Sequence, residues 1–350
     1  MKKLMNYAIY SNEKSSIDGL DVFYVGVENI LPNKKGIKPS SFVPKTGKYT
    51  KFEKYDILLG NIGPYLKKIW LADKSGLASP DVLVIKPLES RFGKYIYANL
   101  LNDSFFQYAM LGVKGSILPR CDKNHILNYS IPDVKNKEKI GDFIYFINKK
   151  IELNNKINDN LEKQMNLVFK NMMSKAMNNK IKGEYVSVKN LTQVITGKED
   201  ANFSDENGKY KFFTCSNETL KCNEYKFNSS SVLIAGNGDF NVKHYAGKFN
   251  AYQRTYVLTP QKDYYALLYL SSVERINALK LRSTGSIIKF ITKNDIETIP
   301  VFIPWEKNIL NILNQLLSLK DKNSNENEYL TALRDYLLPL LLNGQVTIED

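Results

Sequence analysis

Two long stretches of the chain carry apolar residues at steps of three and four positions. The first runs from Lys137 to about Met177 and contains no proline and one glycine, Gly141. Its apolar positions are Ile140, Phe143, Ile147, Ile151, Leu153, Ile157, Leu161, Met165, Val168 and Met172. The second runs from Trp305 towards Leu342, and its apolar positions are Ile309, Ile312 or Leu313, Leu316, Leu319, Leu330, Leu333 and Leu337. This spacing predicts one long amphipathic helix in each stretch.

Local signals predict where the second helix is interrupted and where it ends. Residues 322–327 are mostly weak helix formers, so the sequence predicts a bend or break there. Pro339 predicts a kink or the end of the last turn, and Gly344 predicts a stop. Because an apolar stripe on a long helix must be covered, the simplest arrangement packs the two helices against each other. In the alternative, each helix covers only its own domain.

The segments before each long helix predict globular parts that mix strands and helices. Short β-rich runs bounded by Gly, Pro and Asn lie at 22–27, 56–59 and 82–85, and again at 210–214, 232–235 and 255–258. Helical spacing predicts shorter helices over 95–110 and 264–281.

The two halves of the chain repeat each other at an offset of about 170 residues, which indicates duplicated structural units. The recurring segments are Gly115-Ser116-Ile117 with Gly285-Ser286-Ile287, Lys123-Asn124-x-Ile126 with Lys293-Asn294-x-Ile296, and Ile131-Pro132 with Ile303-Pro304. We expect globular domains at 1–136 and 183–304 and helical spacers at 137–182 and 305–350.

The main information in the amino-acid composition is a strongly basic net charge. The 350 residues carry a net charge of +13, which favours a polyanionic partner; the alternative is a lysine-rich composition without functional meaning. Cys121, Cys215 and Cys222, with His125 and His244, form no zinc-ligand pattern and no disulfide framework. The N-terminus does not resemble a signal peptide, and no apolar run is long enough for a membrane span, so we expect a cytoplasmic protein without a membrane partner.

Several motifs resemble the specificity subunits of Type I restriction–modification systems, over nearly the whole chain. In the long helices they are Lys150-Ile-Glu-Leu-Asn154, Asn160-Leu-Glu162, Phe169 and Leu333-Arg-Asp-Tyr-Leu-Leu-Pro339 with Gly344. In the globular parts they lie at 28–36, 61–70, 236–238 and 247–256.

The resemblance implies an α+β fold and a set of partners. Two mixed α/β target-recognition domains would be separated by an antiparallel coiled-coil pair of long helices, with a pseudo-twofold internal repeat. Each domain would read one half of a bipartite site in double-stranded DNA. Two methyltransferase (modification) subunits would dock along the helices, and motor-nuclease (restriction) subunits would join in a complete enzyme. One departure is Gly63, where the related motif usually has Arg, and this leaves the role of its loop open.

Candidate DNA-contacting residues are basic or amide side chains beside glycine-rich turns, because Lys and Arg bind phosphates and Arg, Asn and Gln read base edges. In the first half they are Asn61, Tyr65, Lys67, Lys68, Lys114 and Arg120. In the second half they are Asn237, Lys248, Gln253, Arg254, Arg282 and Lys289, of which the last two duplicate Lys114 and Arg120. If residues 252–256 form a strand, Gln253 and Arg254 point to opposite faces, so one of them cannot face DNA. The alternative for all of these residues is solvated surface or turn packing.

The sequence offers no convincing catalytic motif. Asn61-Ile-Gly-Pro-Tyr65 lacks the proline pair with which an amino-methyltransferase holds a flipped base, and no Gly-x-x-x-x-Gly-Lys-Ser/Thr loop is present. We therefore expect a non-catalytic subunit that binds neither metal nor cofactor, with S-adenosylmethionine on the partner methyltransferase. Two alternatives stay open: a helical scaffold without specific DNA readout, and a self-contained DNA-modifying enzyme.

Overall fold

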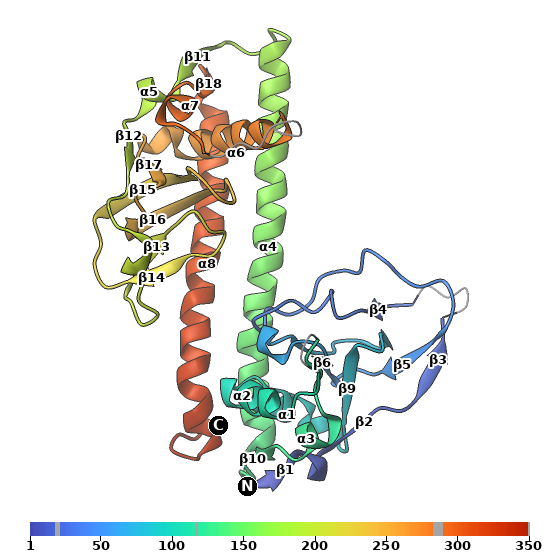
Figure 1. The fold of residues 1–350 in the computed structure, drawn as a ribbon. Helices are drawn as coiled ribbons and strands as arrows, with labels where there is room; N and C mark the ends of the chain where they lie inside the picture. The colour runs from blue at the N-terminus through green and yellow to red at the C-terminus, as the bar shows by residue number, and fades with distance from the viewer. Residues whose placement is uncertain (18–21, 116–117, 283–289, 349–350) are drawn as a thin grey trace. The chain divides into compact units, whose positions relative to one another are not determined.

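The computed structural model describes residues 1–17, 22–115, 118–282 and 290–348, with the side chains of 281 and 282 left out. The chain forms two compact units (Figure 1). Unit 1 consists of Met1–Asn154 and Glu326–Asp350, and unit 2 consists of Asn155–Asn325. Each unit combines sheets with helices, so the fold is α+β as the sequence predicts. Within the described residues, no helix has both the length and the apolar character that crossing a membrane requires.

In the part of unit 1 that the structure describes, there are two four-stranded sheets and one two-stranded sheet, with strand orders β2-β9-β6-β7, β3-β5-β8-β4 and β1-β10. Its strands are β1 Lys2–Lys3, β2 Ala8–Tyr10, β3 Lys14–Ser16, β4 Tyr24–Val25, β5 Lys48–Phe52, β6 Ile57–Gly60, β7 Ile69–Leu71, β8 Gly76–Ala78, β9 Val82–Pro87 and β10 Ser130–Ile131. Its helices are η1 Leu4–Asn6, η2 Pro64–Leu66, η3 Ser90–Phe92, α1 Gly93–Leu100, α2 Asp103–Leu111 and α3 Lys123–Leu127. The single helix expected over 95–110 is therefore two helices. Asn102 separates them because its side chain caps α2 by accepting a hydrogen bond from Ser104 N–H.

Unit 2 contains a six-stranded sheet of order β12-β17-β15-β16-β13-β14 and a two-stranded sheet β11-β18. Its strands are β11 Gly183–Ser187, β12 Val194–Thr196, β13 Tyr210–Phe213, β14 Leu220–Cys222, β15 Phe227–Ala235, β16 Val242–Ala251, β17 Thr255–Leu258 and β18 Pro300–Pro304. Its shorter helices are α5 Val188–Leu191, η4 Ala201–Phe203, η5 Lys262–Tyr264, α6 Tyr265–Arg282 and α7 Lys293–Glu297.

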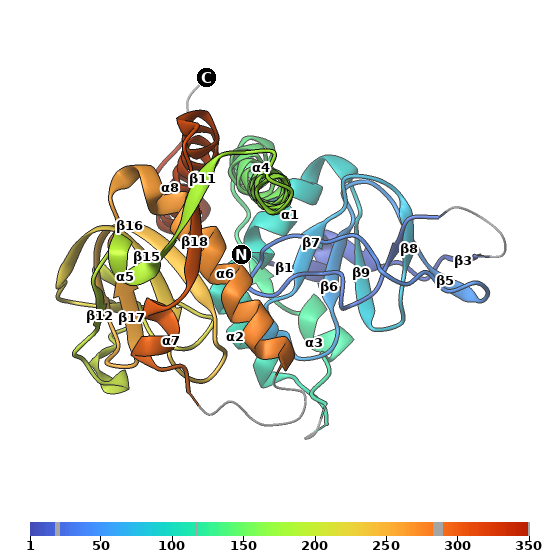
Figure 2. The ribbon, with the colours of Figure 1, turned by 90° about the horizontal axis from the view of Figure 1, so that it is seen from above.

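The internal repeat is visible in the pairing of the first and last strands of each unit and in the helices on either side of the last strand. In unit 1, β1 pairs antiparallel with β10 (Figure 1). In unit 2, β11 pairs antiparallel with β18 (Figure 2). A short helix precedes each closing strand, and a long helix follows it: α3 and α4 around β10, and α7 and α8 around β18. Corresponding elements begin about 170 residues apart, as the sequence repeat predicts.

The two long helices are α4, Lys137–Met177, and α8, Lys307–Leu342. In unit 1, α4 approaches α1 so closely at Gly141 that a Cβ there would lie 2.5 Å from the backbone nitrogen of Tyr95. The one glycine of this helix is thus explained by helix packing.

Both long helices contribute to the core of each unit. The unit 1 core includes Ile140 and Ile144 of α4 and Leu338 and Leu341 of α8. The unit 2 core includes residues of α4 and α8 that pack with the six-stranded sheet and α6: Met165, Phe169, Met172, Leu310, Leu313 and Leu317. The alternative in which each helix covers only its own domain is therefore wrong.

The helices pair antiparallel within each unit through polar side chains. In unit 2, Asn158 Nδ2 donates to Ser324 Oγ at 3.2 Å, and Asn323 Nδ2 donates to Asn158 Oδ1 at 3.0 Å. One turn further along α4, Glu162 forms an ion pair with Lys320.

In unit 1, Asn154 Nδ2 donates to Glu326 Oε2 at 2.7 Å and to Asn327 Oδ1 at 2.9 Å. Closer to the start of α4, Asn148 Oδ1 accepts a 2.7 Å hydrogen bond from Arg334 Nη1. Rising positions on α4 thus meet falling positions on α8 in each unit.

These contacts correct the predicted seam. Leu153 and Ile157, expected on the apolar face, are 46% and 47% exposed, whereas Asn154 and Asn158 are 1% and 9% exposed. On α8, Leu319 and Leu333 are exposed, and Leu313 rather than Ile312 is the buried residue of the pair left open. The middle of the helix pair is therefore held by amide side chains where apolar contacts were expected.

The predicted break at residues 322–327 is also wrong, because α8 is continuous there. Three weak helix formers of this segment, Asn323, Ser324 and Asn327, are partners of Asn154 and Asn158, so cross-helix hydrogen bonds offset their poor propensity.

Pro339 lies inside α8 and does not end it. A proline in a helix interior costs about 3 kcal/mol, but each fully buried leucine contributes about 1.5–3 kcal/mol. Leu338, Leu341 and Leu342 are all buried in the unit 1 core, which holds the last turn in place. Gly344, with φ +76°, stops the helix as predicted.

Candidate nucleic-acid interface

The predicted loop of unit 1 begins where β6 ends. Gly63 has φ +63° and precedes η2, and its N–H donates to Pro119 O at 2.9 Å. An arginine at this position would be strained by about 1–2 kcal/mol in the left-handed region. The departure from the related motif therefore fits the local backbone. Tyr65 projects from η2 and is 58% exposed.

A second segment, Lys114 to Arg120, lies beside this loop. Lys114 and Arg120 exchange two backbone hydrogen bonds of 3.0 and 2.9 Å, and Arg120 also forms a β-bridge with Ile62. Cys121 N–H donates to Asn61 O at 3.0 Å. The structure thus brings Asn61, Lys114 and Arg120 together from two segments about sixty residues apart in the sequence. Residues 116 and 117 of the repeated Gly-Ser-Ile turn lie outside the described residues.

Carboxylates already pair with the basic side chains of this cluster. Arg120 Nη1 lies 2.8 Å from Asp81 Oδ1, and Lys114 Nζ lies 2.5 Å from Asp122 Oδ2. The hydrogen bond from Lys114 lowers the pKa of Asp122 to about 2. A phosphate would have to compete with these exposed ion pairs, which are individually weak.

Lys67 and Lys68 lie at the other end of η2 and have different surroundings. Lys67 shares Asp103 with Lys34, at 2.9 and 3.0 Å respectively. Lys68 Nζ instead donates to Val27 O at 2.8 Å, and burial lowers its pKa. Lys68 therefore supports the loop, and Lys34 is a basic neighbour that the sequence analysis did not select.

Asn61 has an unusual side chain environment. Its Oδ1 is buried and has no hydrogen-bond partner within the part of the chain that the structure describes. A buried acceptor without a partner costs about 1–3 kcal/mol, and such groups are uncommon in folded proteins.

The second unit brings three predicted residues together at one end of its large sheet. Asn237 lies in the turn that follows β15, and Gln253 and Arg254 are exposed in the turn between β16 and β17. Gly236 N–H donates to Arg254 O at 2.8 Å, which joins the two turns. Because β17 begins only at Thr255, the strand alternation expected for Gln253 and Arg254 does not apply, and both can face one ligand.

Lys248 lies apart from these turns. It pairs with Asn228 at the far end of the β15–β16 hairpin, and its ammonium lies 4.7 Å from the centroid of the Tyr225 ring. Arg282 is the last residue of α6, and its side chain lies outside the described residues, as do all of Lys289 and the repeated turn 285–287. The proposed equivalence with Lys114 and Arg120 therefore stays a prediction.

The sequence analysis missed the acidic partners Asp81, Asp103 and Asp122. Only Asp122 carries a sequence signal, because it stands at the N-cap of α3, where its side chain accepts from His125 N–H. The three cysteines are buried and free.

Comparison with known proteins shows which sequences this chain resembles. Residues 181–332 match the family model for the Type I restriction modification DNA specificity domain. Over 171 residues the chain is 37% identical to the Type I restriction enzyme EcoDI specificity subunit of Escherichia coli. That alignment covers 47% of this chain and 38% of the relative, so it spans well under half of the relative's length.

A solved structure resembles the whole fold. The S subunit of the Type I restriction-modification system from M. genitalium matches with a TM-score of 0.63 and 16% sequence identity, covering 99% of this chain and 96% of that one. At this identity the likeness concerns the fold alone. Residues 181–332 thus resemble the Type I restriction modification DNA specificity domain in sequence, and the fold of the chain resembles that of a Type I restriction-modification S subunit.

Proposed function

We propose that this chain reads a bipartite site in double-stranded DNA, with one half of the site recognised by each globular part. The observation that carries this proposal is the duplicated architecture: each unit closes with the same order of short helix, strand and long helix. Two similar DNA-binding parts on one chain are suited to a DNA site with two separate halves. The net charge of +13 favours binding to the phosphate backbone.

The two turn clusters supply side chains suited to base readout. Arg254 and Gln253 in unit 2 and Arg120 in unit 1 carry the donor and acceptor groups that match guanine and adenine edges in the major groove. On binding, DNA phosphates would displace exposed acidic partners such as Asp81 from the arginine.

In this proposal the chain itself carries out no chemistry. Methyl transfer would belong to two methyltransferase subunits that bind S-adenosylmethionine, with motor-nuclease subunits added in a complete restriction enzyme. Exposed apolar side chains on the long helices, including Phe146, Leu167 and Tyr336, offer surface that such subunits would cover.

The helix pair would set the gap between the half-sites, and a matched insertion tests this. One heptad is inserted between Asn154 and Asn155 and a second between Asn325 and Glu326, because both points lie at the boundary between the units. The cross-helix contacts within each unit are then kept. Seven helical residues add about 10 Å, so the gap should lengthen by at most about three base pairs at 3.4 Å each.

The readout is sequencing of methylated sites made by the chain in complex with its methyltransferase. The half-site sequences should stay the same after the insertion, whereas Gln253→Ala and Arg254→Ala should change one half-site and leave the gap unaltered. An unchanged gap in an active complex would show that the helices do not act as a ruler. DNA binding without any sequence preference would favour the scaffold alternative.

A further inference from the structure

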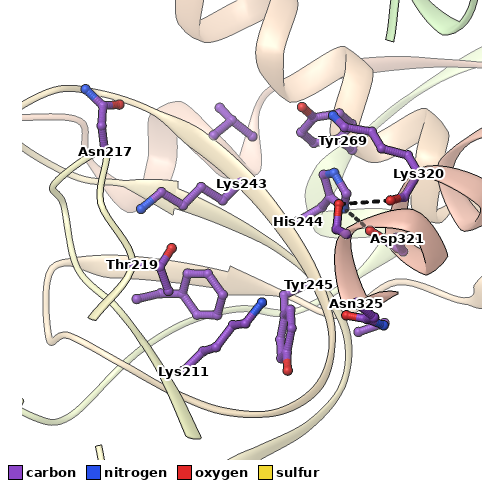
Figure 3. Close-up of a pocket in the computed structure, with 14 residues that line it drawn as sticks. Lys211, Asn217, Thr219, Lys243, His244, Tyr245, Tyr269, Lys320, Asp321 and Asn325 are labelled. Atoms are coloured by element: carbon purple, nitrogen blue, oxygen red, sulfur yellow. Dashed lines mark hydrogen bonds and ion pairs between the residues drawn. The ribbon is translucent and has the colours of Figure 1, made fainter. Parts of the chain in front are cut away.

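Unit 2 contains a hollow of about 360 Å³ that none of the predicted DNA-contacting residues lines. It lies between α8 and the interior strands β13 and β16 of the six-stranded sheet (Figure 3). Lys211 of β13 and Lys243 and Tyr245 of β16 line the sheet side, and Asn217 and Thr219 line it from the loop between β13 and β14. The volume lies in the range of small-ligand sites.

Lys243 is a half-buried cation held by neutral groups. Its Nζ donates to Ser216 O at 2.7 Å and to Glu218 O at 3.2 Å, and within the described chain it forms no ion pair. Burial lowers its pKa, while Asp239 attracts it from a distance. The Asp239 carboxylate itself accepts hydrogen bonds from the backbone and side chain of Asn217. Because an ammonium has three protons, one donor of Lys243 is left for a ligand.

A second lysine and two aromatic rings border the same space. The Lys211 ammonium lies 4.5 Å from the centroid of the Tyr245 ring, and the Phe213 and Tyr245 ring centroids are 5.4 Å apart. Thr219 is exposed at the rim and adds a hydroxyl donor.

Two charged side chains of α8 line the hollow, and each has a neighbour on another element. Asp321 Oδ1 lies 3.2 Å from His244 Nδ1, and Lys320 pairs with Glu162 of α4. Lys320 thus has a carboxylate partner, whereas Lys243 forms no ion pair within the described chain.

We infer that this hollow binds a phosphate group through Lys243 and Thr219, with Lys211 as a further basic residue of its lining. Lysine ammonium groups and a hydroxyl are donors that a phosphate accepts from, and a half-buried cation without a carboxylate gains most from such a ligand. The phosphate could belong to the DNA backbone or to a free phosphate or nucleotide. The first source rests on the proposed function and would add a contact outside the predicted turns, whereas the second is independent of it.

The first experiment titrates the full chain with inorganic phosphate, replacing chloride at constant ionic strength, and follows the midpoint of thermal unfolding. The midpoint should rise to saturation in the wild type and in Lys243→Arg and should not respond in Lys243→Met. Thr219→Val should raise the apparent phosphate dissociation constant about tenfold, as expected when a hydrogen bond to a charged group is lost. Lys189→Met, an exposed lysine of α5 outside the hollow, is the matched control and should respond like the wild type.

The second experiment measures DNA affinity against salt for the complex with the methyltransferase. If the phosphate is that of DNA, Lys243→Met should reduce the slope of log affinity against log salt by about one. A phosphate response with an unchanged slope assigns the site to a free phosphate or nucleotide.

No phosphate response together with an unchanged slope would overturn the inference. If Lys243→Met fails to fold, Thr219→Val carries the same test. A complex that does not bind DNA at all would contradict the proposed function, while the phosphate titration would still decide whether the hollow is a site.

Discussion

Replacing Asn158 with alanine should loosen the middle of α8. Asn158 is 9% exposed and exchanges hydrogen bonds with Asn323 and Ser324 on the partner helix. These contacts hold a stretch of weak helix formers in helical form, so their loss should be felt there first.

The magnitude follows from the groups left without partners. Ser324 Oγ keeps a 2.9 Å hydrogen bond to Lys320 O, so the main loss falls on the amide of Asn323. An unsatisfied buried polar group costs about 1–3 kcal/mol, and the better helix propensity of alanine returns up to about 0.7 kcal/mol. The net local destabilisation should be about 1–2 kcal/mol.

Hydrogen exchange in the full chain measures this effect directly. Amides of residues 320–325 should exchange about tenfold faster in Asn158→Ala, since about 1.4 kcal/mol corresponds to a factor of ten. Asn160→Ala is the matched control, because Asn160 is exposed on the same helix and the substitution changes propensity alone. Equal exchange in the two variants would show that the cross-helix amides do not stabilise this segment.

Three further predictions concern pH, salt and catalysis. Burial raises the pKa of Asp56 to about 6. The stability that comes from keeping this carboxyl group neutral is therefore fully present below about pH 4 and is lost as the pH rises through 6. The free energy of unfolding of Asp56→Asn, measured in urea, should therefore rise relative to that of the wild type by roughly 2–3 kcal/mol between pH 4 and pH 7. A difference in unfolding free energy that does not change with pH would contradict this. Lys114→Ala and Arg120→Ala should each reduce the slope of log DNA affinity against log salt by about one. Asp81→Asn removes the carboxylate that pairs with Arg120 and should therefore strengthen DNA binding. Unchanged slopes would mean that Lys114 and Arg120 only form surface ion pairs. Labelled S-adenosylmethionine should transfer no methyl group to DNA with this chain alone, and transfer would identify it as an enzyme.

The sequence by itself determined the repeat and the two long helices. Helical periodicity placed the first helix at 137 to about 177, and α4 spans Lys137–Met177. It placed the second from 305 towards 342, and α8 spans Lys307–Leu342. Both signals are local, because the spacing of apolar residues and the shared motifs can be seen without knowing what lies opposite them.

Tertiary structure decided which helical face is buried and which charges meet. Leu153 and Asn154 are neighbours on α4, and only the partner helix, with acceptors at Glu326 and Asn327, makes the amide the buried one. Likewise, Arg120 meets Asp81 across 39 residues of sequence. Such pairings join residues far apart in the chain, so no local pattern encodes them, and the burial and charge of each candidate side chain follow from the fold.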